Sequence, residues 1–268
     1  FLDFSILGGI PRQATEKFLN SRECQIDYRG TSHDYDLVVT CTDLIVPQNI
    51  RTKNIILIQE GMTDPEDYRY HLVKKLRLPR FLANTSMTGL SHAYQKFCVA
   101  SEGFKEIFVN KGVDPDKIEV TGIPNFDNVA AYHNNDFPHK DYVLAGTSHL
   151  RETMKYENRK AFILKAVKIA GGDKLIFKLH PNENMKRAYR EIEKYAPNAL
   201  IYNSGNTNHM LANCHTLVTK YSTIIMVALA LGKKVYSDLK EEYQKKITPL
   251  QTGGTSASMI ADVCRRYL

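Results

Sequence analysis

The residues with the clearest chemical potential stand where predicted strands end. One stretch, residues 174–183, reads Lys-Leu-Ile-Phe-Lys-Leu-His-Pro-Asn-Glu. Its apolar part has the length of a buried strand, and Pro181 cannot continue a central strand because proline has no N–H to donate. His180 is therefore expected at the carboxyl end of a strand, on the edge of a sheet where ligands of α/β proteins bind. The same histidine could instead simply cap a turn.

A second stretch places hydroxyl groups at the start of a predicted helix. Tyr221, Ser222 and Thr223 follow the end of a strand, and an apolar helix is expected over 222–231. A helix start offers free backbone N–H groups, and these favour a phosphate group beside the hydroxyls. Ordinary helix capping uses the same residue types, so both interpretations stay open.

A third turn of this kind follows a strand expected at 142–145, where Gly146, Thr147 and Ser148 stand together. Three such turns on one edge of a sheet have the composition of a nucleotide and pyrophosphate site. Three cations could offset the charge of a diphosphate or be solvated instead: Lys178, Lys220 and Arg151. The chain lacks the G-x-G-x-x-G and Walker A patterns, which argues against NAD and ATP sites of the common kinds.

Two carboxylates lie in the loop that follows the strand expected at 54–59. Transfer of a group to a hydroxyl needs a base beside the acceptor, and Glu60 is the first candidate and Asp64 the second. Either could instead serve a turn. His149 and His215 are interpreted as structural. The sequence shows no cluster of metal ligands, so no cofactor is expected to be required. Mg²⁺ could still enter the site bound to the diphosphate of a nucleotide.

The composition suits a globular protein of one large or two ordinary domains, with 268 residues and 43% hydrophobic residues. The absence of a long apolar run leads us to expect a cytoplasmic protein, with a position at the inner face of the membrane as the alternative. Five widely spaced cysteines favour buried, reduced thiols. The start lacks a signal-peptide pattern and an initiator Met, so no signal peptide is expected and the chain could begin downstream of its native N-terminus.

The formal charge of +7 favours anionic partners, among them nucleotides, phosphorylated substrates, membranes and nucleic acid. No nucleic-acid-binding motif is present, so nucleic acid is not an expected partner. Residues 70–80 mix basic and apolar side chains at helical spacing. They could contact an anionic membrane or a lipid-linked phosphate, or form a core helix with a solvated basic face. The sequence makes no prediction of an oligomeric state.

Strands and helices alternate along the chain, which predicts parallel sheets covered by helices. Strands are expected at 35–40, 54–59, 96–100, 117–121, 142–145, 174–179, 199–202, 216–219 and 234–236. Helices are expected at 15–21, 68–78, 101–111, 158–170, 184–195, 206–213, 222–231 and 256–267. The polar, aperiodic residues 132–140 are interpreted as a linker between domains 1–131 and 141–268. The predicted fold class is α/β, with two Rossmann-like doubly wound domains that face a cleft.

Three motifs give the chain a more specific resemblance. Lys178-Leu179-His180-Pro181 is similar to a His-Pro motif, Thr219-Lys220-Tyr221-Ser222-Thr223 to a Thr-Asp-Tyr-Ser-Ser motif, and residues 120–127 to a segment that leaves an N-terminal domain. Together they resemble GT-B glycosyltransferases, in the group of CDP-glycerol glycerophosphotransferases, capsule transferases and UDP-N-acetylglucosamine 2-epimerase. The resemblance covers roughly residues 55–240, in the order in which the family has these motifs.

The resemblance implies that His180, Ser222 and Thr223 hold the nucleotide and phosphates of a donor, with Thr147 and Ser148 as companions. It implies a nucleotide-activated sugar or polyol donor and a saccharide or lipid-linked acceptor, in surface polysaccharide synthesis. Two departures stand out: Lys220 replaces the Asp of the glycerophosphotransferases, and Glu60 replaces a His of the epimerases. A sugar-nucleotide epimerase or hydrolase, and a non-catalytic nucleotide- or polyanion-binding protein, remain alternatives.

Overall fold

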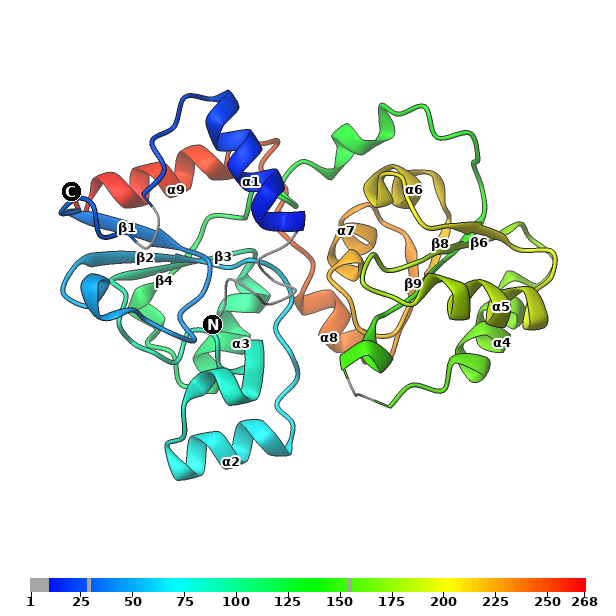
Figure 1. Ribbon diagram of the computed structural model, residues 1–268, viewed down its shortest axis with the longest axis horizontal. Coiled ribbons are helices and arrows are strands. Elements are labelled where there is room, and N and C mark those ends of the chain that lie inside the picture. Colours follow the sequence, from blue (N-terminus) through cyan, green and yellow to red (C-terminus); the bar gives the residue numbers. More distant parts are fainter. Residues whose placement is uncertain (1–9, 28–29, 154–155) are drawn as a thin grey trace.

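The computed structural model describes residues 10–27, 30–153 and 156–268. The first nine residues, on which the expectation of no signal peptide rests, lie outside the described residues. The chain forms two parallel sheets flanked by helices, which lie side by side (Figure 1). The predicted α/β fold class with two Rossmann-like domains is confirmed. All five cysteines are free thiols, as expected, but Cys24 and Cys41 are exposed, which corrects the expectation of buried thiols.

The first sheet has its strands in chain order. They are β1 (Leu37–Thr40), β2 (Asn54–Ile58), β3 (Lys96–Val99) and β4 (Ile118–Val120). Helices α1 (Ile10–Ser21), α2 (Tyr68–Leu76) and α3 (Glu102–Lys111) belong to this half. Short 3₁₀ turns occupy Gln48–Ile50, Arg80–Met87, Pro115–Lys117 and Val129–His133. The sequence prediction placed every one of these strands and the three α-helices, with ends that differ by a few residues.

The second sheet has the strand order β7-β6-β5-β8-β9. Its strands are β5 (Val143–Gly146), β6 (Leu175–Lys178), β7 (Leu200–Tyr202), β8 (Thr216–Val218) and β9 (Lys234–Tyr236). The helices that follow the linker are α4 (Arg159–Ala170), α5 (Met185–Tyr195), α6 (Thr207–Asn213), α7 (Ile224–Ala230), α8 (Glu241–Lys246) and α9 (Ser256–Arg265), with a 3₁₀ turn at Leu150–Thr153. The chain builds outward from β5 to β7 and then crosses to β8 on the other side of β5. The carboxyl edge between β5 and β8 is therefore the topological switch point, where ligands of open α/β sheets bind.

Helix α9 packs on the first sheet, although it follows the whole of the second one. Alternate residues of β2 and β3 point to opposite faces of the sheet. Leu57 and Phe97 belong to the cluster that contains side chains of α3, whereas Ile56 and Cys98 form a separate cluster with Ile260 and Val263 of α9. The sequence assigned 141–268 to one domain, and the structure corrects this for the last helix. The physical reason is that the α9 side of the first sheet buries its apolar residues against this helix.

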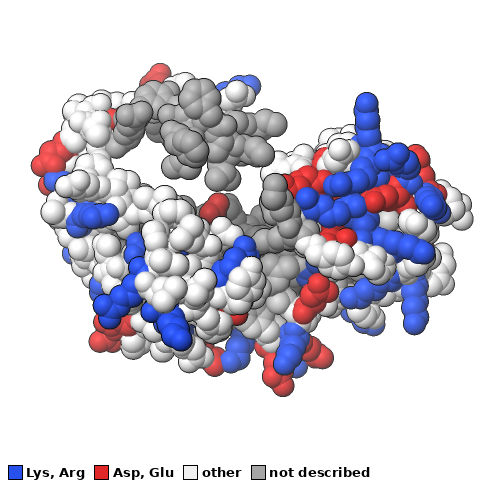
Figure 2. Space-filling view, turned by 60° about the horizontal axis from the view of Figure 1, so that its bottom comes forward, with Lys and Arg blue, Asp and Glu red and all other residues white. Residues whose placement is uncertain are grey.

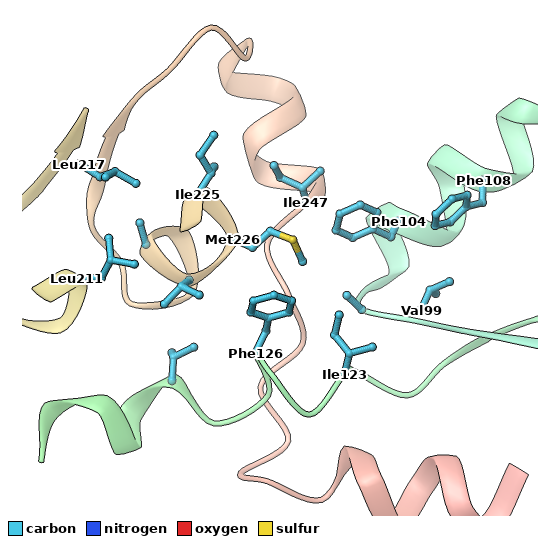
Figure 3. Close-up of a cluster of buried hydrophobic side chains, with 14 of the residues drawn as sticks. Val99, Phe104, Phe108, Ile123, Phe126, Leu211, Leu217, Ile225, Met226 and Ile247 are labelled. Atoms are coloured by element: carbon cyan, nitrogen blue, oxygen red, sulfur yellow. The ribbon is translucent and has the colours of Figure 1, made fainter. Parts of the chain in front are cut away.

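The two halves share one continuous hydrophobic core. Phe104 and Phe126 come from the first half, and Met226 and Ile247 from the second, and all are buried in the same cluster. Figure 3 shows Met226 and Ile247 pointing towards Phe104 and Phe126. Burial of apolar surface on this scale resists separation of the halves in water.

Asp127 joins the two segments that run between the halves. Its buried carboxylate accepts hydrogen bonds from the backbone N–H of Ser256 at 3.0 Å and from the hydroxyl of Thr252 at 2.9 Å. Burial acts to raise the pKa of Asp127, but the bonds from Ser256 and Thr252 outweigh it and hold the pKa below its usual value. The outgoing segment after β4 and the returning segment before α9 are thus bonded to each other.

We expect Ile260→Ala to lower the free energy of unfolding by about 2 to 3 kcal/mol, because it removes a buried side chain from between α9 and the first sheet. Met259→Ala, at a more exposed position of the same helix, is the matched control and should cost less than about 1 kcal/mol. Urea denaturation measures both values. Equal losses would contradict the packing of α9 on this sheet.

Candidate functional site

The switch point of the second sheet is closed by direct contact between its two strands. The hydroxyl of Thr219, just after β8, donates a hydrogen bond to the carbonyl of Gly146, the last residue of β5, at 2.9 Å. A Cβ atom at Gly146 would lie 2.5 Å from Cδ1 of Ile224, which opens α7. The side chain of Ile224 therefore packs directly on the end of β5, and a larger residue at position 146 would have to displace its terminal methyl group.

The Thr147 hydroxyl fastens the turn after β6 to the turn after β5. It accepts a hydrogen bond from the backbone N–H of His180 at 3.0 Å and donates one to Oε2 of Glu183 at 2.5 Å. The Thr147 N–H also donates to the carbonyl of Lys178 at 3.1 Å. The structure thus brings together Thr147 and the His180-Pro181 turn, two of the three turns that the sequence singled out.

His180 is a neutral histidine with one defined donor. Burial lowers its pKa to about 4, and the neighbouring His149 and Lys178 act in the same direction. Its Nδ1 atom accepts a hydrogen bond from the N–H of Asn182 at 3.2 Å. A neutral imidazole with Nδ1 as acceptor carries its proton on Nε2, so Nε2–H is free to donate to a ligand oxygen.

His149 is a neighbour of this site that the sequence analysis set aside as structural. Its ring stacks on the ring of His180, with centroids 4.1 Å apart and an interplanar angle of 27°. The stack fixes the orientation of the His180 imidazole. The position of His149, two residues after Thr147 in the same turn, was the signal that could have revealed it. His215, in contrast, pairs with Asp173 at 3.4 Å at the opposite, amino edge of the sheet.

A buried network of charges supports the turn from behind. Glu183 pairs with Arg159 at 2.5 Å, and Arg159 also bonds to Glu157 at 3.0 Å. Arg151 forms a two-pronged pair with Glu191, with both N–O distances at 2.8 Å. The sequence left open whether Arg151 offsets donor charge or is solvated, and the structure instead pairs its guanidinium with carboxylates.

Lys178 and Ser148, which the sequence predicted to bind the nucleotide donor, are both buried in the structure. Lys178 donates from Nζ to the carbonyl of Leu179 at 3.1 Å, and burial lowers its pKa. The Ser148 hydroxyl is buried and, among the described residues, has no hydrogen-bond partner. Their roles towards a diphosphate stay predictions.

Glu60 and Thr223 both line one cavity between the two halves. The cavity has a volume of about 270 Å³ and is lined by the loop after β2, by Cys41 and Asn125 from the first half and by Thr223 from the second. A Cβ atom at Gly61 would lie 3.1 Å from the Thr223 side chain, so the two halves touch here. The Thr223 side chain does not cap α7, which leaves its hydroxyl available to the cavity.

Gln59 holds the Glu60 loop in place. Its buried side chain donates to the carbonyl of Gly61 at 2.9 Å and accepts a hydrogen bond from the N–H of Ala100 at 2.9 Å. Glu60 itself is exposed. Among the described residues that line the cavity, Glu60 is the single carboxylate.

Asp64 and Tyr221 line a different cavity of about 330 Å³, together with Lys111 and Tyr243. Asp64 accepts a hydrogen bond from the hydroxyl of Thr85 at 2.9 Å, and Tyr221 donates to the carbonyl of Thr63. Asp64 and Tyr221 are thus not among the residues that line the cavity of Glu60 and Thr223, although their partners Thr85 and Thr63 are. In the described part of the chain, no three His, Cys, Asp or Glu side chains gather in a way that could hold a metal ion.

Comparisons with known proteins agree with this arrangement. No family model matches the sequence. The solved structure of UDP-GlcNAc 2-epimerase from Neisseria meningitidis, bound to UDP-GlcNAc, superposes with a TM-score of 0.61 at 15% identity, covering 95% of this chain and 89% of that one. MnaA from S. aureus with UDP gives a TM-score of 0.57 at 12% identity, covering 98% and 80%. The chain has the GT-B fold.

The GT-B fold is the fold that the sequence motifs indicated. One curated protein also shares sequence with the chain: the processive diacylglycerol beta-glucosyltransferase of Staphylococcus carnosus is 28% identical over 151 residues. This match covers 52% of the chain, which spans little more than a third (37%) of that relative's length.

We expect the low pKa of His180 to make folding stability depend on pH. The unfolded histidine titrates near 6.5 and the folded one near 4, so stability is fully present above 6.5 and is lost as the pH falls towards 4. The loss should be on the order of 2 kcal/mol after allowance for partial exposure of the ring. Urea denaturation at several pH values, compared with His180→Gln, isolates this contribution. Parallel pH profiles for the two proteins would show that His180 is not shielded as described.

Proposed function

We propose that this GT-B protein transfers a glycosyl group from a nucleotide-activated donor to a hydroxyl acceptor at the cavity between its two halves. The observation that carries the proposal is that Glu60 of the first half and Thr223 of the second line the same cavity. The first half thus offers a carboxylate, and the second half offers a hydroxyl beside the switch point of its sheet. A volume of about 270 Å³ is at the small end of the range for ligand sites. It would suit the reacting part of a donor, with the nucleotide extending along the second sheet.

The turns of the second sheet would bind the donor. The Nε2–H of His180 would donate to a phosphate or ribose oxygen, and Ser222 and Thr223 would donate from their hydroxyls. Because His180 is neutral, it recognises the donor by hydrogen bonding and leaves the charge of the leaving diphosphate to be met by other dipoles. The expectation that any Mg²⁺ arrives on the donor diphosphate stays a prediction.

Glu60 would act as the base. Its carboxylate would take the proton of the acceptor hydroxyl while the hydroxyl oxygen forms a bond to the anomeric carbon of the donor. The bond from that carbon to the diphosphate oxygen breaks, and its electron pair leaves with the nucleoside diphosphate. The named relative, a diacylglycerol glucosyltransferase, supports glycosyl transfer, and the solved structures that contain UDP-GlcNAc or UDP support a nucleotide-sugar donor. A saccharide or lipid-linked acceptor and a place in surface polysaccharide synthesis remain predictions.

The likeness to epimerase structures favours a second candidate, a sugar-nucleotide epimerase or hydrolase. That reaction would turn over the nucleotide sugar without an acceptor and would need more than one acid or base at the sugar. Glu60 is the single carboxylate among the described residues that line the cavity, and this supports transfer over epimerisation. A non-catalytic protein would bind nucleotides and show no turnover.

A panel of CMP, CDP, UMP, UDP, GDP and ADP tests the donor site by thermal shift. A nucleotide present at a hundredfold excess over its dissociation constant should raise the melting temperature by about 5 to 10 °C. His180→Ala should abolish this shift, whereas His215→Ala, at the opposite edge of the same sheet, should keep it. If no nucleotide shifts the wild-type protein, or if both variants behave alike, the proposed donor site is wrong.

Glu60→Gln should lower turnover of the donor by about a hundredfold or more while nucleotide binding is unchanged, because it removes the base and preserves the shape of the side chain. Asp64→Asn is the matched control: Asp64 lines the neighbouring cavity and is not among the residues that line the Glu60 cavity, so turnover should change little. Release of the nucleoside diphosphate, measured with and without an acceptor, provides the readout. Turnover that is independent of an acceptor would favour the epimerase or hydrolase, and full activity of Glu60→Gln would remove Glu60 from the mechanism.

A further inference from the structure

Helix α2 uses one face to pack on the protein. Asp67 caps its start by accepting hydrogen bonds from the N–H groups of Arg69 and Tyr70, at 2.9 and 3.2 Å. Tyr70 and Val73 are buried against the segment that contains Met87. These residues lie three positions apart and define the inner face of the helix.

The outer face of α2 and the segment after it expose apolar side chains. Tyr68 is 77% exposed and Leu76 is 56% exposed, and with Leu72 they lie at i, i+4 and i+8, in one stripe along the helix. The exposed apolar residues of this region, which we name the α2 patch, are Tyr68, Leu72, Leu76, Leu78, Phe81 and Leu82. Single apolar side chains on a surface are ordinary, but six within residues 68–82 mark an interaction site.

The charges of the α2 patch are of one sign. Residues 68–82 contain five cations and no Asp or Glu: Arg69, Lys74, Lys75, Arg77 and Arg80. Arg69 pairs with the capping Asp67, and Arg80 donates to the carbonyl of Asp43, whereas Lys75 and Arg77 are exposed. Figure 2 brings the lower side of the molecule forward and shows Lys and Arg side chains standing among uncharged atoms on the first half.

We propose that the α2 patch binds the surface of an anionic lipid bilayer. Leucine and aromatic side chains would enter the boundary between headgroups and acyl chains, and Lys75 and Arg77 would meet lipid phosphates. The combination fits a bilayer better than a second copy of this chain, because a symmetric contact would bring the exposed Lys75 and Arg77 of one copy towards the same cations of the other. It also fits better than nucleic acid, because most of the exposed apolar side chains are leucines, which give bases no ring to stack on.

The α2 patch is adjacent in the chain to the loop that lines the Glu60 cavity. The loop that starts at Glu60 runs directly into α2, with Asp67 as its last residue before the helix. None of the described helices combines the length and the apolar character that crossing a bilayer requires. The α2 patch would therefore hold the protein on a membrane from one side, with the Glu60 loop next to the bound segment.

Sedimentation with vesicles tests this inference without any assay of activity. The chain is mixed with vesicles of phosphatidylcholine alone and with vesicles that also contain phosphatidylglycerol. We expect binding to the anionic vesicles that is at least about tenfold stronger and that weakens at high salt. Leu72→Ser/Leu76→Ser and Lys75→Gln/Arg77→Gln should each reduce binding by about tenfold or more, since one removes buried apolar area and the other removes two cations.

Helix α4 provides matched controls, because it also exposes Leu164 and Val167 beside Lys165 and Lys168. Leu164→Ser/Val167→Ser and Lys165→Gln/Lys168→Gln should bind vesicles like the wild type. Circular dichroism confirms that each variant is folded. Equal binding to both kinds of vesicle, wild-type binding by the α2 variants, or equal losses in the α4 variants would overturn the inference. So would a dimer in light scattering that Leu72→Ser/Leu76→Ser dissolves, because the α2 patch would then be a contact between copies.

Discussion

The arrangement depends on one hydrophobic core that runs from the first sheet to the second. Phe104 and Phe126 of the first half pack with Met226 and Ile247 of the second, so the halves meet through apolar surface that water would otherwise cover. This burial brings the Glu60 loop against Thr223 and leaves a small cavity between them. The hydrogen bonds of Asp127 hold the segment after β4 against the segment before α9, and so fix how these two connections between the halves lie on each other. The site is thus a product of the packing between halves and belongs to neither half alone.

His180 is kept neutral and is held in one orientation by its neighbours. The imidazole is desolvated and stacked on His149, which keeps it neutral, while Asn182 determines which nitrogen carries the proton. Glu152 acts in the opposite direction and raises the pKa of His180, but burial and the neighbouring His149 and Lys178 outweigh it. A neutral donor of this kind can recognise an oxygen by position, and its hydrogen bond does not depend on pH near neutrality.

Much of the fold could be predicted from the sequence because its strands are short, apolar and ended by glycine, proline or polar residues. The runs at 54–59 and 174–179 gave β2 and β6 almost residue for residue. Helix α8 was missed because its sequence, Glu-Glu-Tyr-Gln-Lys-Lys, has no apolar periodicity. The destination of α9 was missed because an amphipathic pattern shows that a helix will pack, but does not show on which sheet.

The turns that form the site could be predicted from the sequence, but the contacts that their side chains make could be predicted less well. Strand ends placed Thr147, His180 and Thr223 on one edge, because parallel strands bring their carboxyl ends together. The commitment of Arg151 to Glu191, and the separation of Asp64 from Glu60, depend on contacts between residues far apart in the chain. The stack of His149 on His180 depends on ring orientations that residue spacing does not encode.

The return of α9 to the first sheet has a consequence for synthesis on the ribosome. The side of the first sheet that exposes Ile56 and Cys98 stays uncovered until residues 256–265 have emerged, after every strand of the second sheet has been made. The first half cannot complete its folding before the second sheet has been synthesised. During elongation an apolar sheet face is therefore open to chaperones, and the emergence of α9 closes it.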